Sequence, residues 1–122
     1  MADFAAQVDG TTVSVTVTDG NAINAAIQFL ADALQADRAL TVGEVIVGQD
    51  TTFSSALIAA DNVRIRLPAG VTLSLDTAIE GSAYNLGSTH GAGLVGEGTL
   101  AIGGNAANAI SGAGSTAPVI GN

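Results

Sequence analysis

The residues whose types could support catalysis are few and lie apart along the chain. Asp76 and Glu80 are two carboxylates four positions apart, which could place a general acid beside a general base for glycoside hydrolysis. The same spacing equally suits the solvated surface of a turn. His90 is the sole histidine and stands among Ser, Thr and Gly, where a histidine is usually a solvated loop residue. We therefore expect no catalytic residue and no enzymatic activity.

The motifs that could hold a cofactor or a metal are equally sparse. Residues 91–96 match Gly-x-Gly-x-x-Gly by letter. No helix pattern follows these glycines, however, and a dinucleotide pyrophosphate needs the N-terminus of a helix. Cysteine is absent, which removes disulfides, thiolate metal sites and thiol nucleophiles together. The sequence predicts neither a cofactor nor a metal.

The charge balance excludes two classes of partner. Asp and Glu total 11 against three arginines and no lysine, which gives a net charge of -8. Because affinity for phosphate rests on clustered Lys and Arg, we expect no binding to nucleic acid or to an anionic membrane. No apolar stretch approaches the ~18 residues that a membrane-spanning helix needs, and no signal peptide is recognisable. We expect a soluble protein that is made in a cytoplasm.

Two of the three arginines lie close together on one predicted strand. In residues 63–67, side chains alternate between the two faces, so Arg64 and Arg66 point away from their apolar neighbours. They could pair with acids of the same chain, or contact an acidic partner or a neighbouring subunit. The acids considered as intramolecular partners are Asp50, Asp61 and Asp76.

The elements that must position these residues begin with a β-hairpin at residues 1–18. Asp9-Gly10 is a strong signal for a two-residue turn, which would set Val8 opposite Thr11. Valine alternates with Thr or Ser in residues 12–18, the pattern of a half-buried strand. We interpret it as an edge strand with a solvated hydroxyl face, and an ice-binding threonine row is the alternative.

An amphipathic helix is expected after the hairpin. Asp19 or Asn21 can cap its N-terminus, and Asp37-Arg38 marks its end. Its apolar residues recur at helical spacing and form one stripe, which must be buried against another element. The stripe contains Ile23, Ile27, Leu30 and Leu34, with Ala26 and Ala31 beside it.

Short strands separated by Gly, Asn and Asp follow the helix. They are predicted at residues 44–48, 55–58, 63–67 and 71–75, and shorter ones at 94–95, 99–102, 108–110 and 118–120. Aromatic residues make up only 3% of the chain, so a core of Ala, Val, Ile and Leu must be thin and repetitive. This pattern favours a solenoid of about three coils, close to the smallest stable number.

Three segments resemble, in their order, the opening of the pectate-lyase-like right-handed parallel β-helix superfamily. They are residues 19–28, the Leu-Pro-Ala-Gly-Val-Thr segment 67–72, and the Gly-Leu-Val-Gly-Glu-Gly-Thr-Leu segment 93–100. The resemblance implies an all-β fold, a short right-handed single-stranded parallel β-helix of residues 19–122, whose first coil is covered by one amphipathic capping helix. The hairpin of residues 1–18 would precede it. Enzymes of this superfamily carry clustered acids or a calcium site, which this sequence does not show.

Small acidic β-rich chains of this kind also look like virion components of tailed bacteriophages, where β-helix modules occur as trimeric tailspikes and as capsid decoration proteins. This resemblance implies a non-enzymatic homotrimeric capsid decoration (cement) protein on the capsid surface, bound to a major capsid protein. The alternatives are a tailspike or tail-fibre module and a carbohydrate-binding or carbohydrate-degrading fragment of a larger β-helix protein. We expect sister chains to order residues 103–122. The candidate interface residues are Arg64, Arg66, Ile110, Val119 and Ile120.

Overall fold

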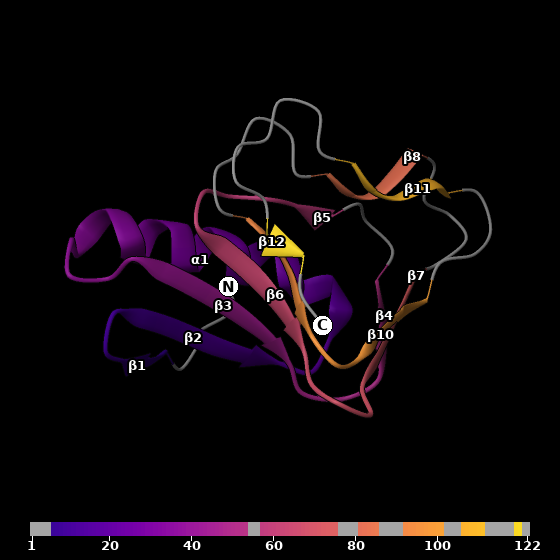
Figure 1. Cartoon of the computed structure of the whole chain (residues 1–122), viewed down its shortest axis with the longest axis horizontal. Helices are drawn as coiled ribbons and strands as arrows, with labels where there is room; N and C mark the ends of the chain where they lie inside the picture. Colours follow the sequence, from indigo (N-terminus) through magenta and orange to yellow (C-terminus); the bar gives the residue numbers. More distant parts are fainter. Residues whose placement is uncertain are drawn as a thin grey trace.

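Short β-strands and one α-helix make up the structure, a computed structural model that describes residues 6–53, 57–75, 81–85, 92–101, 106–111 and 119–120 (Figure 1). The first elements are β1 (Gln7–Asp9), β2 (Thr12–Val17), the 3-10 helix η1 (Gly20–Ala22), α1 (Ile23–Ala36), β3 (Val42–Val47), β4 (Thr51–Phe53) and β5 (Leu57–Ile58). They are followed by β6 (Val63–Leu67), β7 (Thr72–Leu75), β8 (Gly81–Asn85), β9 (Gly93–Gly96), β10 (Thr99–Ala101), β11 (Ala106–Ser111) and β12 (Val119–Ile120). The fold is therefore all-β in class with one α-helix.

The strands form three sheets that the chain enters in a fixed order. Sheet A has the strand order β1-β2-β3-β6-β9-β12, sheet B has β10-β7-β4, and sheet C has β11-β8-β5. From β3 to β11 the chain passes through sheets A, B and C in turn, three times, and β12 returns to sheet A. Every pairing is parallel except that of β1 with β2. From one passage to the next, each strand thus pairs with the corresponding strand of the same sheet.

The core face of sheet A follows from side-chain alternation. Along β2, buried valines alternate with exposed or half-buried Ser and Thr, as the sequence predicts. The register then aligns Val15 with Val45 of β3, and Val45 with Ile65 of β6. All three side chains are buried, so successive strands add their apolar residues to the same row.

The hairpin differs from its predicted register. Asp9 pairs with Thr12 and Val8 with Val13, so Gly10 and Thr11 form the turn. Among the described residues before Asn62, only Gly10 has a positive φ, +63°. A turn with glycine in its first central position needs only that one residue in the left-handed region, whereas a turn centred on Asp9-Gly10 would need both. The prediction that β2 is an edge strand is also wrong, because β2 lies between β1 and β3.

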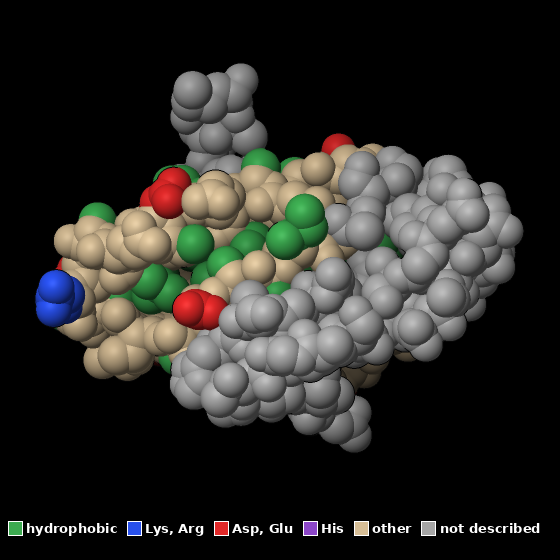
Figure 2. Space-filling model, turned by 90° about the horizontal axis from the view of Figure 1, so that it is seen from above, with side chains coloured by type: hydrophobic (Ala, Val, Ile, Leu, Met, Phe, Trp, Pro, Cys, Tyr) green, Lys and Arg blue, Asp and Glu red, His purple; other side chains and the backbone are tan. Residues whose placement is uncertain are grey.

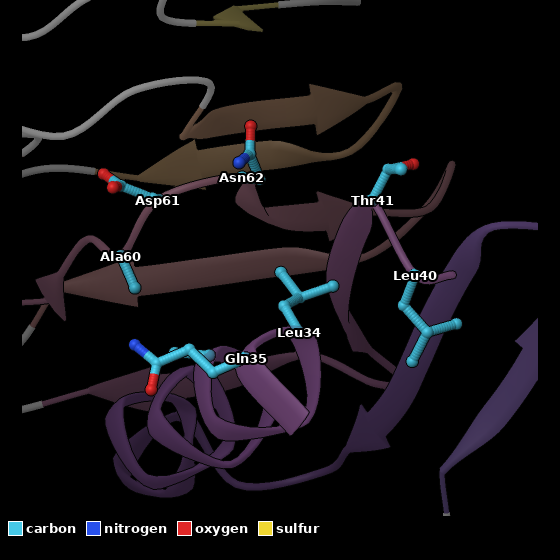
Figure 3. Close-up of a pocket in the computed structure, with 8 residues that line it drawn as sticks. Leu34, Gln35, Leu40, Thr41, Ala60, Asp61 and Asn62 are labelled. Atoms are coloured by element: carbon cyan, nitrogen blue, oxygen red, sulfur yellow. The ribbon is translucent and has the colours of Figure 1, made fainter. Parts of the chain in front are cut away.

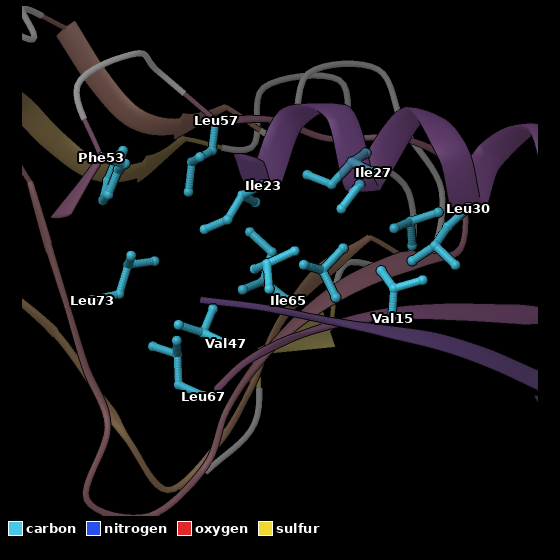
Figure 4. Close-up of a cluster of buried hydrophobic side chains, with 14 of the residues drawn as sticks. Val15, Ile23, Ile27, Leu30, Val47, Phe53, Leu57, Ile65, Leu67 and Leu73 are labelled. Atoms are coloured by element: carbon cyan, nitrogen blue, oxygen red, sulfur yellow. The ribbon is translucent and has the colours of Figure 1, made fainter. Parts of the chain in front are cut away.

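Helix α1 buries the predicted stripe against the sheets. Ile23, Ala26, Ile27 and Leu30 are buried. Figure 4 shows Ile23, Ile27 and Leu30 pointing into the core. Leu34 is half-buried. The stripe prediction is confirmed. The Asp19 carboxylate accepts a hydrogen bond from the Asn21 backbone N–H at 2.9 Å and caps η1, so the α-helix itself begins two residues after Asn21.

The start of the helical region also contacts the edge strands of sheets B and C. The Gly20 backbone N–H donates to the hydroxyl oxygen of Thr51, the first residue of β4, at 3.0 Å. The Ile58 backbone N–H donates to the Asn24 side-chain oxygen at 3.0 Å, which satisfies an edge donor of β5. Phe53, Leu57 and Leu73 extend the core into these sheets (Figure 4). The sequence prediction missed β4 and β8, whereas the other described strands overlap predicted segments.

The corner between sheets A and B is built on backbone contacts, and we call Gly96 to Gly98 the glycine corner. The Gly98 N–H donates to the Leu67 carbonyl at 2.8 Å. Gly96 has a φ of +108°, and a Cβ atom on it would lie 2.3 Å from the same carbonyl oxygen. A Cβ atom on Gly98 would lie 2.6 Å from the Val71 carbonyl oxygen. Only glycine lets the two successive corners stack this closely.

Candidate interface and groove

The two arginines of the candidate interface lie on β6, on the face of sheet A that points away from the core. Burial alternates along β6, with Val63, Ile65 and Leu67 buried and both arginines half-buried. The parallel register sets Arg64 beside Glu44 and Arg66 beside Ile46 on β3. The predicted outward direction of Arg64 and Arg66 is confirmed.

Arg66 forms a two-point ion pair with Glu44. Its Nε donates to Oε1 at 3.0 Å, and its Nη2 donates to Oε2 at 2.9 Å. The predicted acidic partners are therefore wrong for Arg66. Asp50 instead accepts a hydrogen bond from the Thr72 backbone N–H at 2.8 Å, and Asp76 lies outside the described residues.

The ion pair changes how both groups titrate. The hydrogen bonds from Arg66, assisted by the charges of Arg66 and Arg64, hold the pKa of Glu44 below its ordinary value, while partial burial acts against them. The hydrogen bonds to Glu44 raise the pKa of Arg66. Because the Arg66 side chain is 42% exposed and that of Glu44 15%, solvent screens the pair on the arginine side.

Arg64 brings a second positive charge to the same carboxylate. Its Nε is buried and, in the part of the chain that the structure describes, has no hydrogen-bond partner. In the next strand its register partner is Gly93, which has no side chain to contact it. In the described part of the chain only Arg66 is ion-paired with Glu44, and the nearby charge of Arg64 makes this a positive patch on a chain of net charge -8.

The other three candidate interface residues fall on two sheets. Val119 pairs with Gly93, which pairs with Arg64, so the register places Val119 in the row of Arg64. Ile120 pairs with Leu94 and lies in the row of Ile65. Ile110 lies on β11, which belongs to sheet C. The fold therefore brings Arg64, Arg66, Val119 and Ile120 onto sheet A and leaves Ile110 on another sheet.

A groove of about 500 Å³ lies beside the last turns of α1, and we call it the α1 groove (Figure 3). Helix α1, the loop before β3 and the corner before β6 each contribute to it. Its apolar surface comes from Ala31, Leu34, Leu40 and Ala60, and its polar groups come from Gln35, Thr41, Asp61 and Asn62.

The corner before β6 shapes one wall of the α1 groove. Asn62 has a φ of 60°, a left-handed conformation that Asn tolerates better than most residues. Its carbonyl accepts a hydrogen bond from the Gly43 N–H at 2.9 Å, and the Ala60 carbonyl accepts one from the Val63 N–H at 3.2 Å. This turn fixes Asp61 at the groove. Sequence reasoning missed the groove because its lining comes from three separate segments, and the Asp-Asn turn was the one local signal.

The residues considered for chemistry contribute no described site. Asp76, Glu80 and His90 lie outside the described residues. Within the described ranges, no group of three or more His, Asp or Glu residues could hold a metal ion. No helix in that part of the chain is long and apolar enough to cross a membrane.

Comparisons of the chain with models of protein families, with curated proteins and with solved structures found no match. Its function must therefore be argued from the geometry of the chain itself.

Proposed function

We propose that this chain is a non-enzymatic virion structural protein, a homotrimeric capsid decoration protein built on a short right-handed parallel β-helix. The coil organisation is supported by the parallel register of sheets A, B and C. It is also supported by the fixed order in which the chain enters them, three times between β3 and β11. In a β-helix each passage through the three sheets is one coil, and every coil contacts only its neighbours.

Helix α1 serves as the cap of the first coil in this proposal. The hydrogen bonds from Gly20 to Thr51 and from Ile58 to Asn24 support this role, because they join the helical region to the edges of sheets B and C. Its buried stripe covers the apolar interior at the same end. Natural proteins cover strand edges because an uncovered edge can pair with other chains.

The observation that carries the oligomer proposal is the contrast between the two ends of the stacked sheets. β12, β10 and β11 are terminal in sheets A, B and C, and among the described residues no strand pairs with their outer edges. Sister chains that cover these edges would remove the same liability that the helical region removes at β4 and β5, the opposite edges of sheets B and C. A closed ring of three copies lets every copy use the same two surfaces.

The positive patch is proposed as the contact with the capsid protein. Arg64 and Arg66 face outward from sheet A, and of these two only Arg66 is paired with Glu44, while the chain as a whole is strongly acidic. A patch of this kind favours an acidic surface on the partner, and the net negative charge limits nonspecific association.

Light scattering of the purified protein at micromolar concentration tests the oligomer. One chain has a mass of 11.9 kDa, so three chains give 3 × 11.9, or about 36 kDa. A chain without residues 103–122 should lose this mass and aggregate or unfold. If the full-length protein is a stable monomer, or if the shortened chain keeps the same mass and stability, the trimer proposal is wrong.

Shells of the major capsid protein with and without the added chain test the virion role. We expect the added chain to stabilise such shells against heat or osmotic shock, and R64E/R66E to abolish this effect while leaving the oligomer mass unchanged. Equal protection by R64E/R66E would contradict the role of the positive patch. Co-sedimentation with tails instead of shells would favour the tail-fibre alternative.

A further inference from the structure

We propose that Asp9 is a site of spontaneous aspartate isomerisation, in which the link between Asp9 and Gly10 rearranges through a succinimide to an isoaspartyl link. The proposal is independent of the trimer and of the positive patch, because the reaction needs no partner molecule. Asp-Gly occurs twice in the chain, at Asp9-Gly10 and at Asp19-Gly20. The structure distinguishes the two sites by what surrounds the backbone nitrogen of the glycine.

The rearrangement joins two atoms of the chain and then consumes one water molecule. The Gly10 backbone nitrogen attacks Cγ of the Asp9 carboxyl group and closes a five-membered ring, while the carboxyl hydroxyl group and the amide proton leave as water. A second water molecule then opens the ring without any oxidation or reduction. Cleavage of the new N–Cγ bond restores aspartate. Cleavage of the bond from the same nitrogen to the main-chain carbonyl carbon leaves isoaspartate, whose main chain runs through Cγ.

Exposure of the carboxylate does not by itself distinguish the two sites. Asp9 and Asp19 are both exposed. Acidic side chains also lie at the surface elsewhere, as the red groups on the face seen in Figure 2 show. The reaction further requires the glycine nitrogen to lose its proton and to move towards the carboxyl carbon. The freedom of that nitrogen is therefore the deciding property.

The Gly10 nitrogen has this freedom. Gly10 is exposed, and a Cβ atom on it would meet nothing within 4 Å. Neither its N–H nor the Asp9 carboxylate has a hydrogen-bond partner within the described ranges. β1 consists of three exposed residues and is the terminal strand of sheet A, beside β2 (Figure 1). A short terminal strand opens locally at a low cost in free energy, which lets the Asp9-Gly10 link rotate into the ring geometry.

The Gly20 nitrogen is already hydrogen-bonded and buried. Its N–H donates to the Thr51 hydroxyl oxygen at 3.0 Å, and the Asp19 carboxylate accepts from the Asn21 N–H at 2.9 Å. Gly20 is buried so closely that a Cβ atom on it would clash with the Thr52 carbonyl oxygen. Ring closure there would break both hydrogen bonds and move the chain away from β4. We therefore expect Asp19 to resist the reaction while the protein is folded.

Isomerisation of Asp9 would release β1 from β2. The isoaspartyl link adds one carbon atom to the main chain at Asp9, which pairs with Thr12 next to the turn. The two pairs that precede Asp9 in β1 would lose their register as well. β2 would then become the exposed edge of sheet A, and an exposed edge can pair with other chains.

Ageing of the folded full-length chain in ¹⁸O-labelled water tests the proposal. Digestion in ordinary water with a protease that cleaves before Asp but not before isoaspartate, followed by mass spectrometry, locates the modified residues. We expect at least about tenfold more isoaspartate at position 9 than at position 19, because opening the Gly20 site costs more free energy than opening β1. The isoaspartate should carry one ¹⁸O atom from ring opening. Equal amounts at the two positions, or isoaspartate without ¹⁸O, would overturn the proposal.

Two controls separate the effect of the fold from that of the local sequence. In urea that unfolds the chain, both Asp-Gly sequences should form isoaspartate at rates within about twofold of each other, since neither nitrogen is protected there. A tenfold difference that persists in urea would mean that the fold does not select Asp9. D9E keeps the charge but would need a six-membered ring, so position 9 should stay unmodified. Modification of D9E at this position would contradict the succinimide route.

Hydrogen exchange tests the consequence for the hairpin. In the purified isoaspartyl chain, exchange should be faster than in the unmodified chain at residues 12–14, which pair with β1, and unchanged at residues 43–47 of β3. Unchanged exchange at residues 12–14 would show that β1 stays paired, which contradicts its release.

Discussion

The helix-covered face of sheet A and the glycine corner are stabilised in different ways. Between α1 and sheet A, branched aliphatic side chains fill the space, and Leu30 and Ile65 are fully buried there. At the glycine corner, the backbone of Gly96 and Gly98 lies directly on the backbone of the preceding passage. The helix-covered face should tolerate the replacement of one apolar side chain by another of similar volume, but not by a polar one. The glycine corner should not tolerate a side chain at Gly96 or Gly98.

The largest expected effect is that of L30D on the helix-covered face. Leu30 has 0% exposure, and burying an unpaired carboxylate costs several kcal/mol, against a total stability of roughly 5–15 kcal/mol. We expect no soluble folded protein, measured as soluble yield and by circular dichroism. Q28D places the same carboxylate on an exposed position of α1 and should fold. An L30D protein with an unchanged melting temperature would show that the buried stripe is assigned wrongly.

A smaller loss is expected from G96A at the glycine corner. The added methyl would meet the Leu67 carbonyl oxygen at 2.3 Å, and the φ of +108° is unfavourable for alanine. We expect a loss of about 2–5 kcal/mol in the free energy of unfolding, the sum of overpacking and left-handed strain. Urea titration measures it.

G70A is the matched control for G96A. Gly70 also has a positive φ, +84°, but a Cβ atom there would meet nothing within 4 Å. Its expected cost is only the conformational one, about 1–2 kcal/mol. Equal losses for the two variants would mean that the stacked backbone contact at the glycine corner contributes nothing.

The smallest expected effect is the pH dependence that Glu44 adds on the outer face of sheet A. Its pKa is lowered in the folded protein, so the stabilisation is complete above its ordinary pKa of 4.5 and is lost as the pH falls through the lowered value. Because Arg66 is 42% exposed, we expect at most about 1 kcal/mol. E44Q should therefore be less stable than the natural chain at pH 7 and nearly equal to it at pH 3. A difference in the free energy of unfolding that does not change with pH would exclude the ion pair as its source.

Local periodicity in the sequence predicted much of the described fold. The α1 stripe, the alternation in β2 and the outward direction of Arg64 and Arg66 all depend on spacing within one element, which the sequence contains directly. The hairpin register was wrong because Asp9-Gly10 and Gly10-Thr11 are both acceptable turns, and only the pairing of β2 distinguishes them.

The candidate site was less accessible to sequence reasoning, since its contacts join distant residues. Glu44 and Arg66 are 22 positions apart and meet only because β3 and β6 pair in a particular parallel register. The α1 groove combines α1 with two turns that follow different elements. Register between passages depends on how many residues each corner holds, and no local pattern specifies that number.

The early position of α1 in the chain has a consequence for the order of folding. β2, α1 and β3 lie close together in the sequence, contact one another within residues 12–47, and already bury apolar side chains. Since a nascent polypeptide folds from its N-terminus as it leaves the ribosome, this unit can form before the later passages are synthesised. Each later strand can then pair with a strand that has already folded, and only the short loop between the two passages has to close. The helix would thus act as a starting template, from which the sheets lengthen strand by strand in the direction of synthesis.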